Sequence, residues 1–126
     1  MLLPSKTILV VDDNPHVCSL MARVLRDGGY DVLEAHDGPE ALRLLPTIPD
    51  LQLLVTDVVM PGLNGFDLAS HIVAALNVPV LFVSAYAHSR PEFPGPLLEK
   101  PFSAEALLDV VAQLLALADL SAKRTV

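Results

Sequence analysis

The stretch Thr7-Ile8-Leu9-Val10-Val11-Asp12-Asp13-Asn14-Pro15 decides the fold. Residues 7–11 form a short, mainly apolar run, which is typical of a central strand that is buried on both faces of a parallel sheet. Asn14 then offers a helix N-cap, and Pro15 suits the first position of the helix that follows. A buried strand that passes directly into a capped helix is the first half of a parallel α/β unit.

The same alternation of short apolar runs and helical periods continues along the chain, without repeats or low-complexity segments. Further strands are predicted at residues 30–35, 51–56, 79–84 and 96–99. Helices are predicted from Pro15 to the Gly28-Gly29 pair, at 37–45 before Pro46, at 66–76, and from Ser103 to about Leu120. The apolar stripe of the first helix consists of Val17, Leu20, Met21, Val24 and Leu25, and that of the third consists of Phe66, Ala69, Ile72, Val73 and Leu76.

The length and composition fit one small domain. With 126 residues and 13.5 kDa, the chain is expected to form a single domain over residues 1–126, with its core between 6 and 119 and no output domain. The formal net charge of −7 disfavours direct contact with nucleic acid phosphates. No apolar run reaches the roughly 18 residues of a membrane span, and no signal peptide is recognisable, so we expect a cytoplasmic protein without membrane insertion.

The histidines and the single cysteine receive no chemical role from their positions in the sequence. A lone Cys18 excludes an internal disulfide framework and a zinc site built from cysteines. The histidines, at positions 16, 36, 71 and 88, have no mutual spacing that is typical of a metal site. We therefore expect the histidines at the surface and Cys18 packed in the first helix.

Three acidic residues stand directly after the first and third apolar strands, namely Asp12, Asp13 and Asp57. In an open parallel sheet, ligands bind at the carboxyl edge of the central strands, so these carboxylates are expected to converge there. Two unit charges 4 Å apart repel by about 4 kcal/mol at an effective dielectric near 20. A cation is therefore required, and the oxygen-only ligand set favours Mg²⁺ over Zn²⁺, with Mn²⁺ as an alternative.

The fourth and fifth strands bring a hydroxyl and an ammonium group to the same edge, because they end at Ser84 and Lys100. Both groups can bind an anion. Together with an acidic metal site they indicate a phosphoryl-transfer centre, in which Asp57 is the natural nucleophile.

Four blocks of sequence resemble the receiver domain of bacterial two-component response regulators. These blocks are Val10-Val11-Asp12-Asp13-Asn14-Pro15, Thr56-Asp57-Val58-Val59-Met60-Pro61-Gly62-Leu63-Asn64-Gly65, Val83-Ser84-Ala85-Tyr86 and Lys100-Pro101-Phe102. The resemblance extends from residue 6 to about 119, and the segments Ser84-Ala85-Tyr86 and Leu97 to Phe102 resemble receivers fused to hybrid histidine kinases. It implies a flavodoxin-like α/β sheet in the order 2-1-3-4-5. It also implies phosphorelay signalling, with a sensor histidine kinase or a phosphotransfer protein as the donor.

The resemblance assigns a role to each residue of the site. Asp57 is implied to be the phosphoacceptor, Asp13 a direct Mg²⁺ ligand and Asp12 a ligand mainly through water, while Val59 contributes its backbone carbonyl. Ser84 and Lys100 are implied to bind the phosphoryl group, and Tyr86 is implied to change rotamer with Ser84. The peptide bond between Lys100 and Pro101 is implied to be cis.

One segment departs from the family pattern. Only sixteen steps separate Ser84 from Lys100, and Pro91, Pro94, Gly95 and Pro96 exclude a regular helix from the second half of this stretch. We therefore expect a shortened or irregular fourth helix, and a signalling surface that differs from the family's usual one.

Two alternatives to the phosphoacceptor function remain, together with one open question about the last helix. A receiver-like module could dock on a partner without being phosphorylated, or the acidic site could belong to a metal-dependent phosphatase. The last helix has more apolar residues than one sheet face can bury. This excess predicts either a homodimer through the last helix or a helix that lies deeper in the core.

Overall fold

The structure is a computed structural model that describes residues 5–85 and 95–124, with side chains as far as Ser121. Five parallel strands form one sheet in the order β2-β1-β3-β4-β5. They are β1 (Thr7–Val11), β2 (Asp31–Ala35), β3 (Leu51–Asp57), β4 (Val80–Ser84) and β5 (Leu97–Glu99). This topology confirms the predicted doubly wound fold.

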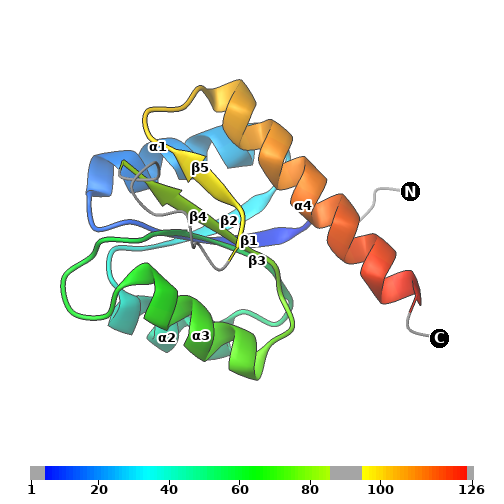
Figure 1. Cartoon of the computed structure of the whole chain (residues 1–126), viewed down its shortest axis with the longest axis horizontal. Coiled ribbons are helices and arrows are strands. Elements are labelled where there is room, and N and C mark those ends of the chain that lie inside the picture. Colours follow the sequence, from blue (N-terminus) through cyan, green and yellow to red (C-terminus); the bar gives the residue numbers. More distant parts are fainter. Residues whose placement is uncertain (1–4, 86–94, 125–126) are drawn as a thin grey trace.

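Helices cover both faces of the sheet (Figure 1). One face carries α1 (Pro15–Asp27) and α4 (Ala104–Arg124), and the other carries α2 (Gly38–Leu44) and α3 (Gly65–Ala75). A short 3-10 turn, η1 (Leu45–Thr47), follows α2 and contains Pro46. Among the described residues, no helix combines the length and the apolar character that crossing a membrane requires.

The two cores follow from the alternation of side chains along β1. Ile8 and Val10 point toward α1 and α4, whereas Leu9 and Val11 point toward α2 and α3. All four side chains are fully buried. Because successive residues of a strand face opposite sides, a strand buried on both faces must be apolar throughout, as the run at 7–11 predicts.

Local capping fixes where the helices begin. Asn14 Oδ1 accepts hydrogen bonds from the backbone N–H groups of His16 and Val17, as expected for the N-cap of α1. Asp37 caps α2, Asn64 caps α3, and Ser103 Oγ accepts from the N–H of Ala106 in α4. Each of the helices beside the sheet edge therefore starts at a defined residue.

The structure corrects two of the predicted apolar stripes. Leu20 of α1 is 62% exposed and Val73 of α3 is 46% exposed, so neither belongs to the core. Cys18 and Ala22 are buried in α1 instead, and Leu68 is buried in α3. The periodicity of apolar residues predicts which side of a helix faces the core, but with an error of about one residue in the rotation of the helix. This error explains why the pattern assigns Leu20 and Val73 to the core.

Two further predictions about the helices can be compared with the described residues, and a third cannot. The Gly28-Gly29 pair ends α1 as predicted, and Gly29, with φ 98°, is its left-handed residue. The last helix continues to Arg124, beyond the expected end at Leu120. The predicted shortening of the fourth helix falls largely on residues 86–94, which lie outside the described residues.

Candidate functional site

The three acidic residues of the sequence prediction meet at the carboxyl edge of the sheet. Asp12 and Asp13 follow β1, and Asp57 is the last residue of β3. The two strands are neighbours, with Val11 opposite Thr56. One carboxylate oxygen from each aspartate lies within 4.8 Å of the others. The expected convergence of these carboxylates is therefore present in the fold.

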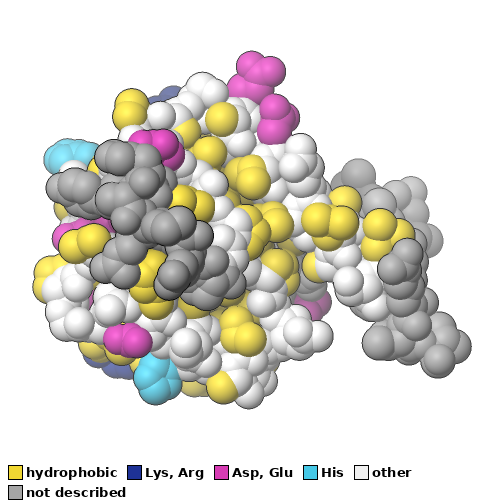
Figure 2. Space-filling model, in the orientation of Figure 1, with side chains coloured by type: hydrophobic (Ala, Val, Ile, Leu, Met, Phe, Trp, Pro, Cys, Tyr) yellow, Lys and Arg dark blue, Asp and Glu magenta, His cyan; other side chains and the backbone are white. Residues whose placement is uncertain are grey.

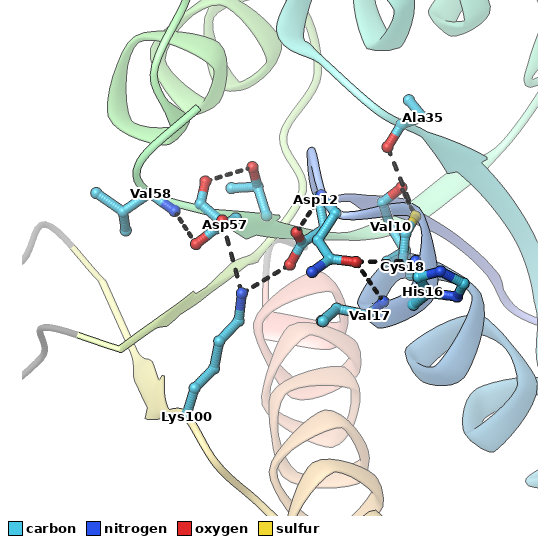
Figure 3. A network of polar contacts seen from close by, with 11 residues as sticks. Val10, Asp12, His16, Val17, Cys18, Ala35, Asp57, Val58 and Lys100 are labelled. Carbon is cyan, nitrogen blue, oxygen red and sulfur yellow. Dashed lines mark hydrogen bonds and ion pairs between the residues drawn. The ribbon is translucent and has the colours of Figure 1, made fainter. Parts of the chain in front are cut away.

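Asp12 is held by hydrogen bonds to both of its carboxylate oxygens, and its side chain is fully buried. Oδ1 accepts from the backbone N–H of Asn14 at 2.9 Å, and Oδ2 accepts from Lys100 Nζ at 2.8 Å. Its own backbone N–H donates to the carbonyl of Ala35 at the end of β2. These contacts fix the carboxylate in one position at the bottom of the site (Figure 3).

Asp57 lies at the centre of the sheet edge and is only 8% exposed. Its Oδ1 accepts from the backbone N–H of Val58 at 2.9 Å, and its Oδ2 lies 3.6 Å from Lys100 Nζ. The pKa of Asp57 is raised to about 6, first by burial and then by the negative charges of Asp12 and Asp13, while Lys100 and the hydrogen bond from Val58 act in the opposite direction. The position thus holds a carboxylate whose negative charge is poorly compensated.

Among the described residues, Lys100 is the one cation that forms ion pairs with this cluster. It follows β5, and its backbone N–H donates to the carbonyl of Ser84 at 2.9 Å. The Lys100–Pro101 peptide bond is cis. The sequence predicts Lys100 as an anion-binding group, but here its ammonium contacts Asp12 and approaches Asp57. It therefore offsets part of the repulsion among the carboxylates.

The other predicted site residues lie around this centre. Asp13 is exposed at the rim, the side chain of Val59 is 62% exposed, and Ser84 is buried at the end of β4. Ser84 is opposite Glu99 in the register of β4 and β5, which brings it to the same edge as Lys100. Tyr86 lies outside the described residues.

Gly65 is a structural requirement of the site that the sequence reasoning missed. Its N–H donates to the carbonyl of Val58 at 2.8 Å, which returns the loop after β3 to the sheet edge. A Cβ atom at position 65 would lie 2.1 Å from the backbone oxygen of Asp57. The available signal was the position of this glycine directly after the N-cap Asn64, at the first residue of α3.

The residues of the cluster fit a divalent cation of the hard, oxygen-binding class. Three carboxylates against one ammonium leave a formal charge of −2 when all are ionised. Carboxylate and carbonyl oxygens are the ligands that Mg²⁺ prefers in proteins. A bound divalent ion would neutralise the remaining charge and would lower the pKa of Asp57 toward its ordinary value.

The family model for the response regulator receiver domain matches residues 8–93. The chain belongs to this family. A receiver domain is the signalling module of a two-component response regulator. The strand order, the acidic edge and the ammonium at the end of β5 are thus features of a two-component receiver.

Curated relatives of this receiver domain are bacterial. The chain is 39% identical over 114 residues to "Uncharacterized transcriptional regulatory protein YrkP" of Bacillus subtilis, covering 85% of this chain and 48% of that protein. It is 41% identical over 78 residues to the transcriptional regulatory protein CpxR of Escherichia coli, covering 62% and 33%. The receiver domain thus spans half or less of the length of these relatives.

Solved structures of receiver domains superpose on this fold. The receiver domain from the hybrid histidine kinase CckA is 40% identical, with a TM-score of 0.76, covering 86% of this chain and 98% of that chain. The response regulator TrrA from Thermotoga maritima, solved in complex with Mg(2+)-BeF, is 30% identical, with a TM-score of 0.78 and the same coverage of 86% and 98%.

Proposed function

We propose that Asp57 accepts a phosphoryl group from the phosphohistidine of a sensor histidine kinase or a phosphotransfer protein, in a Mg²⁺-dependent reaction. The observation that carries this proposal is the position of Asp57, a nearly buried carboxylate among two further carboxylates and one ammonium. Asp12, Asp13, Asp57 and the backbone carbonyl of Val59 would hold the ion. When bound, Mg²⁺ would supply positive charge to the oxygens of the phosphoryl group.

The transfer exchanges a P–N bond for a P–O bond. A carboxylate oxygen of Asp57 attacks phosphorus, the bond to the imidazole nitrogen breaks, and its electron pair remains on that nitrogen, which takes up a proton. The N–H of Val58 holds one oxygen of Asp57 in place. Lys100, already at the cluster, neutralises charge on the transferred group. The product is an acyl phosphate on Asp57.

Phosphorylation of Asp57 would place a new anion, the phosphoryl group, at the sheet edge, where neighbouring polar side chains could bind it. Ser84 is the last residue of β4, the strand next to β3, and it directly follows Val83, which lies opposite Asp57. It is therefore placed to move toward a phosphoryl group on Asp57. We expect the Ser84 hydroxyl to bind a phosphoryl oxygen and Tyr86 to change rotamer with it. This local change would alter the surface that partners contact.

An apolar groove beside the site supports the proposal that the phosphoryl donor is a protein. It has a volume of about 410 Å³ and lies between α1 and the segment from Lys100 to α4. Lys100 lines the groove as well as contacting the acidic cluster. Leu20 lines it too, although this leucine is 62% exposed in the free domain. A helix of the phosphohistidine protein that covered Leu20 would bring its phosphoryl group to Asp57.

The exposed apolar side chains at the end of α4 support the proposal that the domain forms a homodimer. Leu107, Val111 and Leu115 pack against the sheet, but α4 continues past the body of the domain (Figure 1). Leu117 and Leu120 are 60% and 55% exposed there, and Figure 2 shows hydrophobic side chains along this part of the helix. We propose that the same surface of a second copy covers these leucines.

The remaining features of the proposal concern the whole molecule. The domain would act in the cytoplasm, where its phosphohistidine donors act, without direct contact with nucleic acid. It would form one receiver domain over residues 1–126. Its chemistry would be limited to its own phosphorylation and dephosphorylation, with no external substrate.

Incubation with phosphoramidate tests this function, followed by intact-protein mass measurement with and without Mg²⁺. We expect one phosphoryl group per chain with Mg²⁺, little without it, and none in Asp57→Asn. The matched control is Asp67→Asn, in which an exposed aspartate of α3 is changed and phosphorylation should persist. A folded protein that gains no phosphoryl group would instead be a docking module, and repeated turnover of the donor without a stable adduct would indicate a phosphatase.

A further inference from the structure

A second group of metal-binding side chains lies outside the acidic cluster, at the end of β2. It consists of Cys18 from α1, Glu34 from β2 and His36, which directly follows β2. One ligand atom of each residue lies within 4.8 Å of those of the other two. The fold creates this group, because Cys18 is sixteen residues away from Glu34 in the sequence.

The sulfur forms the buried end of the group. Cys18 has no exposed surface, and its thiol hydrogen bonds to the carbonyl oxygens of Val10 and Ala35, at 3.7 and 3.6 Å. Figure 3 shows the Cys18 side chain next to Val10 and Ala35. Because both carbonyls belong to strands of the sheet, the sulfur is held at a fixed position under the end of β2.

The other two ligands reach the surface. Glu34 is half-buried, and its Oε2 accepts from Arg26 at 3.1 Å. His36 is exposed, and its backbone N–H donates to the carboxylate of Glu40. An ion could therefore approach from the solvent side between Glu34 and His36 and meet the sulfur at the inner end.

We propose that Cys18, Glu34 and His36 form a site for Zn²⁺ or a cation of similar softness. Sulfur, imidazole nitrogen and carboxylate oxygen are the ligands that Zn²⁺ takes in proteins, at distances of about 2.0–2.3 Å. Tetrahedral ligands at those distances lie up to about 3.8 Å apart, and the three ligand atoms lie within 4.8 Å of one another, so the side chains need to close by no more than about 1 Å. The exposed His36 can supply most of this movement.

The charges of the proposed site balance. Binding of Zn²⁺ displaces the thiol proton of Cys18 to solvent, and the resulting thiolate and the Glu34 carboxylate together neutralise the ion. His36 binds as the neutral imidazole, and a water molecule completes four ligands. The acidic cluster offers oxygen alone, so the two sites differ in the metal that each prefers.

The site adjoins the acidic cluster through one shared carbonyl. The oxygen of Ala35 accepts hydrogen bonds from the Cys18 thiol and from the backbone N–H of Asp12. Loss of the thiol proton on metal binding removes one of these two bonds. Asp12 and its neighbours therefore share a structural element with the proposed zinc site.

Co²⁺ titration tests the proposal, because a thiolate–cobalt charge-transfer band in this protein can arise only from its single cysteine. The titration is done with saturating Mg²⁺ to occupy the acidic cluster. We expect one equivalent of Co²⁺ to produce the band, Zn²⁺ to displace it, and Cys18→Ser to abolish it. His36→Ala and Glu34→Gln should weaken binding by at least about tenfold.

The control variant is His71→Ala, which removes an exposed histidine from α3 and should leave the titration unchanged. His36 is exposed, so its variant keeps the core intact even if Cys18→Ser does not fold. Absence of the band in the folded wild type would overturn the proposal. Equal Co²⁺ affinities of the His36 and His71 variants would overturn it as well. Neither result depends on phosphorylation of Asp57.

Discussion

Nζ of Lys100 donates a hydrogen bond of 2.8 Å to Oδ2 of Asp12, a carboxylate with no exposed surface. Burying a carboxylate away from water is costly unless hydrogen bonds and opposite charge replace its hydration. Lys100 provides that charge in the absence of a bound ion. It therefore has a structural role in the resting domain, beside its proposed role in binding the phosphoryl group.

Lys100→Met should therefore destabilise the metal-free domain by about 3 kcal/mol, because it leaves Asp12 buried without a counter-charge. Saturating Mg²⁺ should restore much of this loss, since a divalent ion replaces the missing positive charge. Urea denaturation with and without Mg²⁺ measures both effects. Lys6→Met is the control, because Lys6 pairs with the exposed Asp119 and should change stability by less than about 1 kcal/mol. Equal losses in the two variants would contradict this interpretation.

Asp57→Asn should stabilise the metal-free domain at neutral pH. The pKa of Asp57 is raised from 3.8 to about 6, so between these values the folded state binds more protons than the unfolded state. The contribution of Asp57 to stability is therefore fully present below about pH 4 and is lost as pH rises through about 6, by up to about 3 kcal/mol. The asparagine variant should avoid this loss, so its advantage should appear near pH 7.5 and vanish near pH 4. Thermal unfolding at both pH values tests it, and an advantage of the same size at pH 4 would count against the stated cause.

Gly65→Ala should disrupt the loop that follows Asp57. The new Cβ would lie 2.1 Å from the Asp57 backbone oxygen, and that backbone cannot move without shifting the phosphoacceptor. We expect a loss of about 3 kcal/mol or more in unfolding free energy. Gly62→Ala is the control: its φ of 75° makes alanine strained, but no atom lies within 4 Å, so the loss should be about 1 kcal/mol. A smaller effect at position 65 than at 62 would show that the loop can relax.

The double variant Leu117→Gln, Leu120→Gln should convert a homodimer into a monomer. The two leucines are the large apolar side chains exposed on the projecting end of α4, and burying them is the proposed driving force for association. Sedimentation velocity at micromolar concentration measures the oligomeric state. Leu20→Gln removes an equally exposed leucine from α1 and should leave the dimer intact. A wild-type protein that sediments as a monomer would rule out the proposed interface.

The sheet and the acidic edge could be predicted because both depend on local patterns. Buried strands such as residues 7–11 are apolar throughout, and parallel strands present their carboxyl ends at one edge, so Asp12 and Asp57 had to become neighbours. The position of Ser84 and Lys100 at the same edge follows from the same rule. No knowledge of side-chain packing was needed for these features.

Other features depend on tertiary packing and could not be read from periodicity. Whether Leu20 is covered depends on how α1 rotates against the sheet, and its exposure creates the groove beside Lys100. The meeting of Cys18 with His36 depends on how α1 lies against the end of β2. How much of α4 is covered depends on where the packing of the domain ends along this helix. The sequence does not show that position, so burial of the helix and association with a second copy remained open alternatives.

Reductive trapping of the phosphorylated protein tests the central claim most directly. Borohydride converts an acyl phosphate on an aspartate into homoserine, which tandem mass spectrometry can locate in a peptide. After treatment with phosphoramidate and Mg²⁺, we predict homoserine at position 57 and aspartate unchanged at positions 12 and 13. Homoserine at another position, or none in protein that carries a phosphoryl group, would contradict the assignment of Asp57 as the phosphoacceptor.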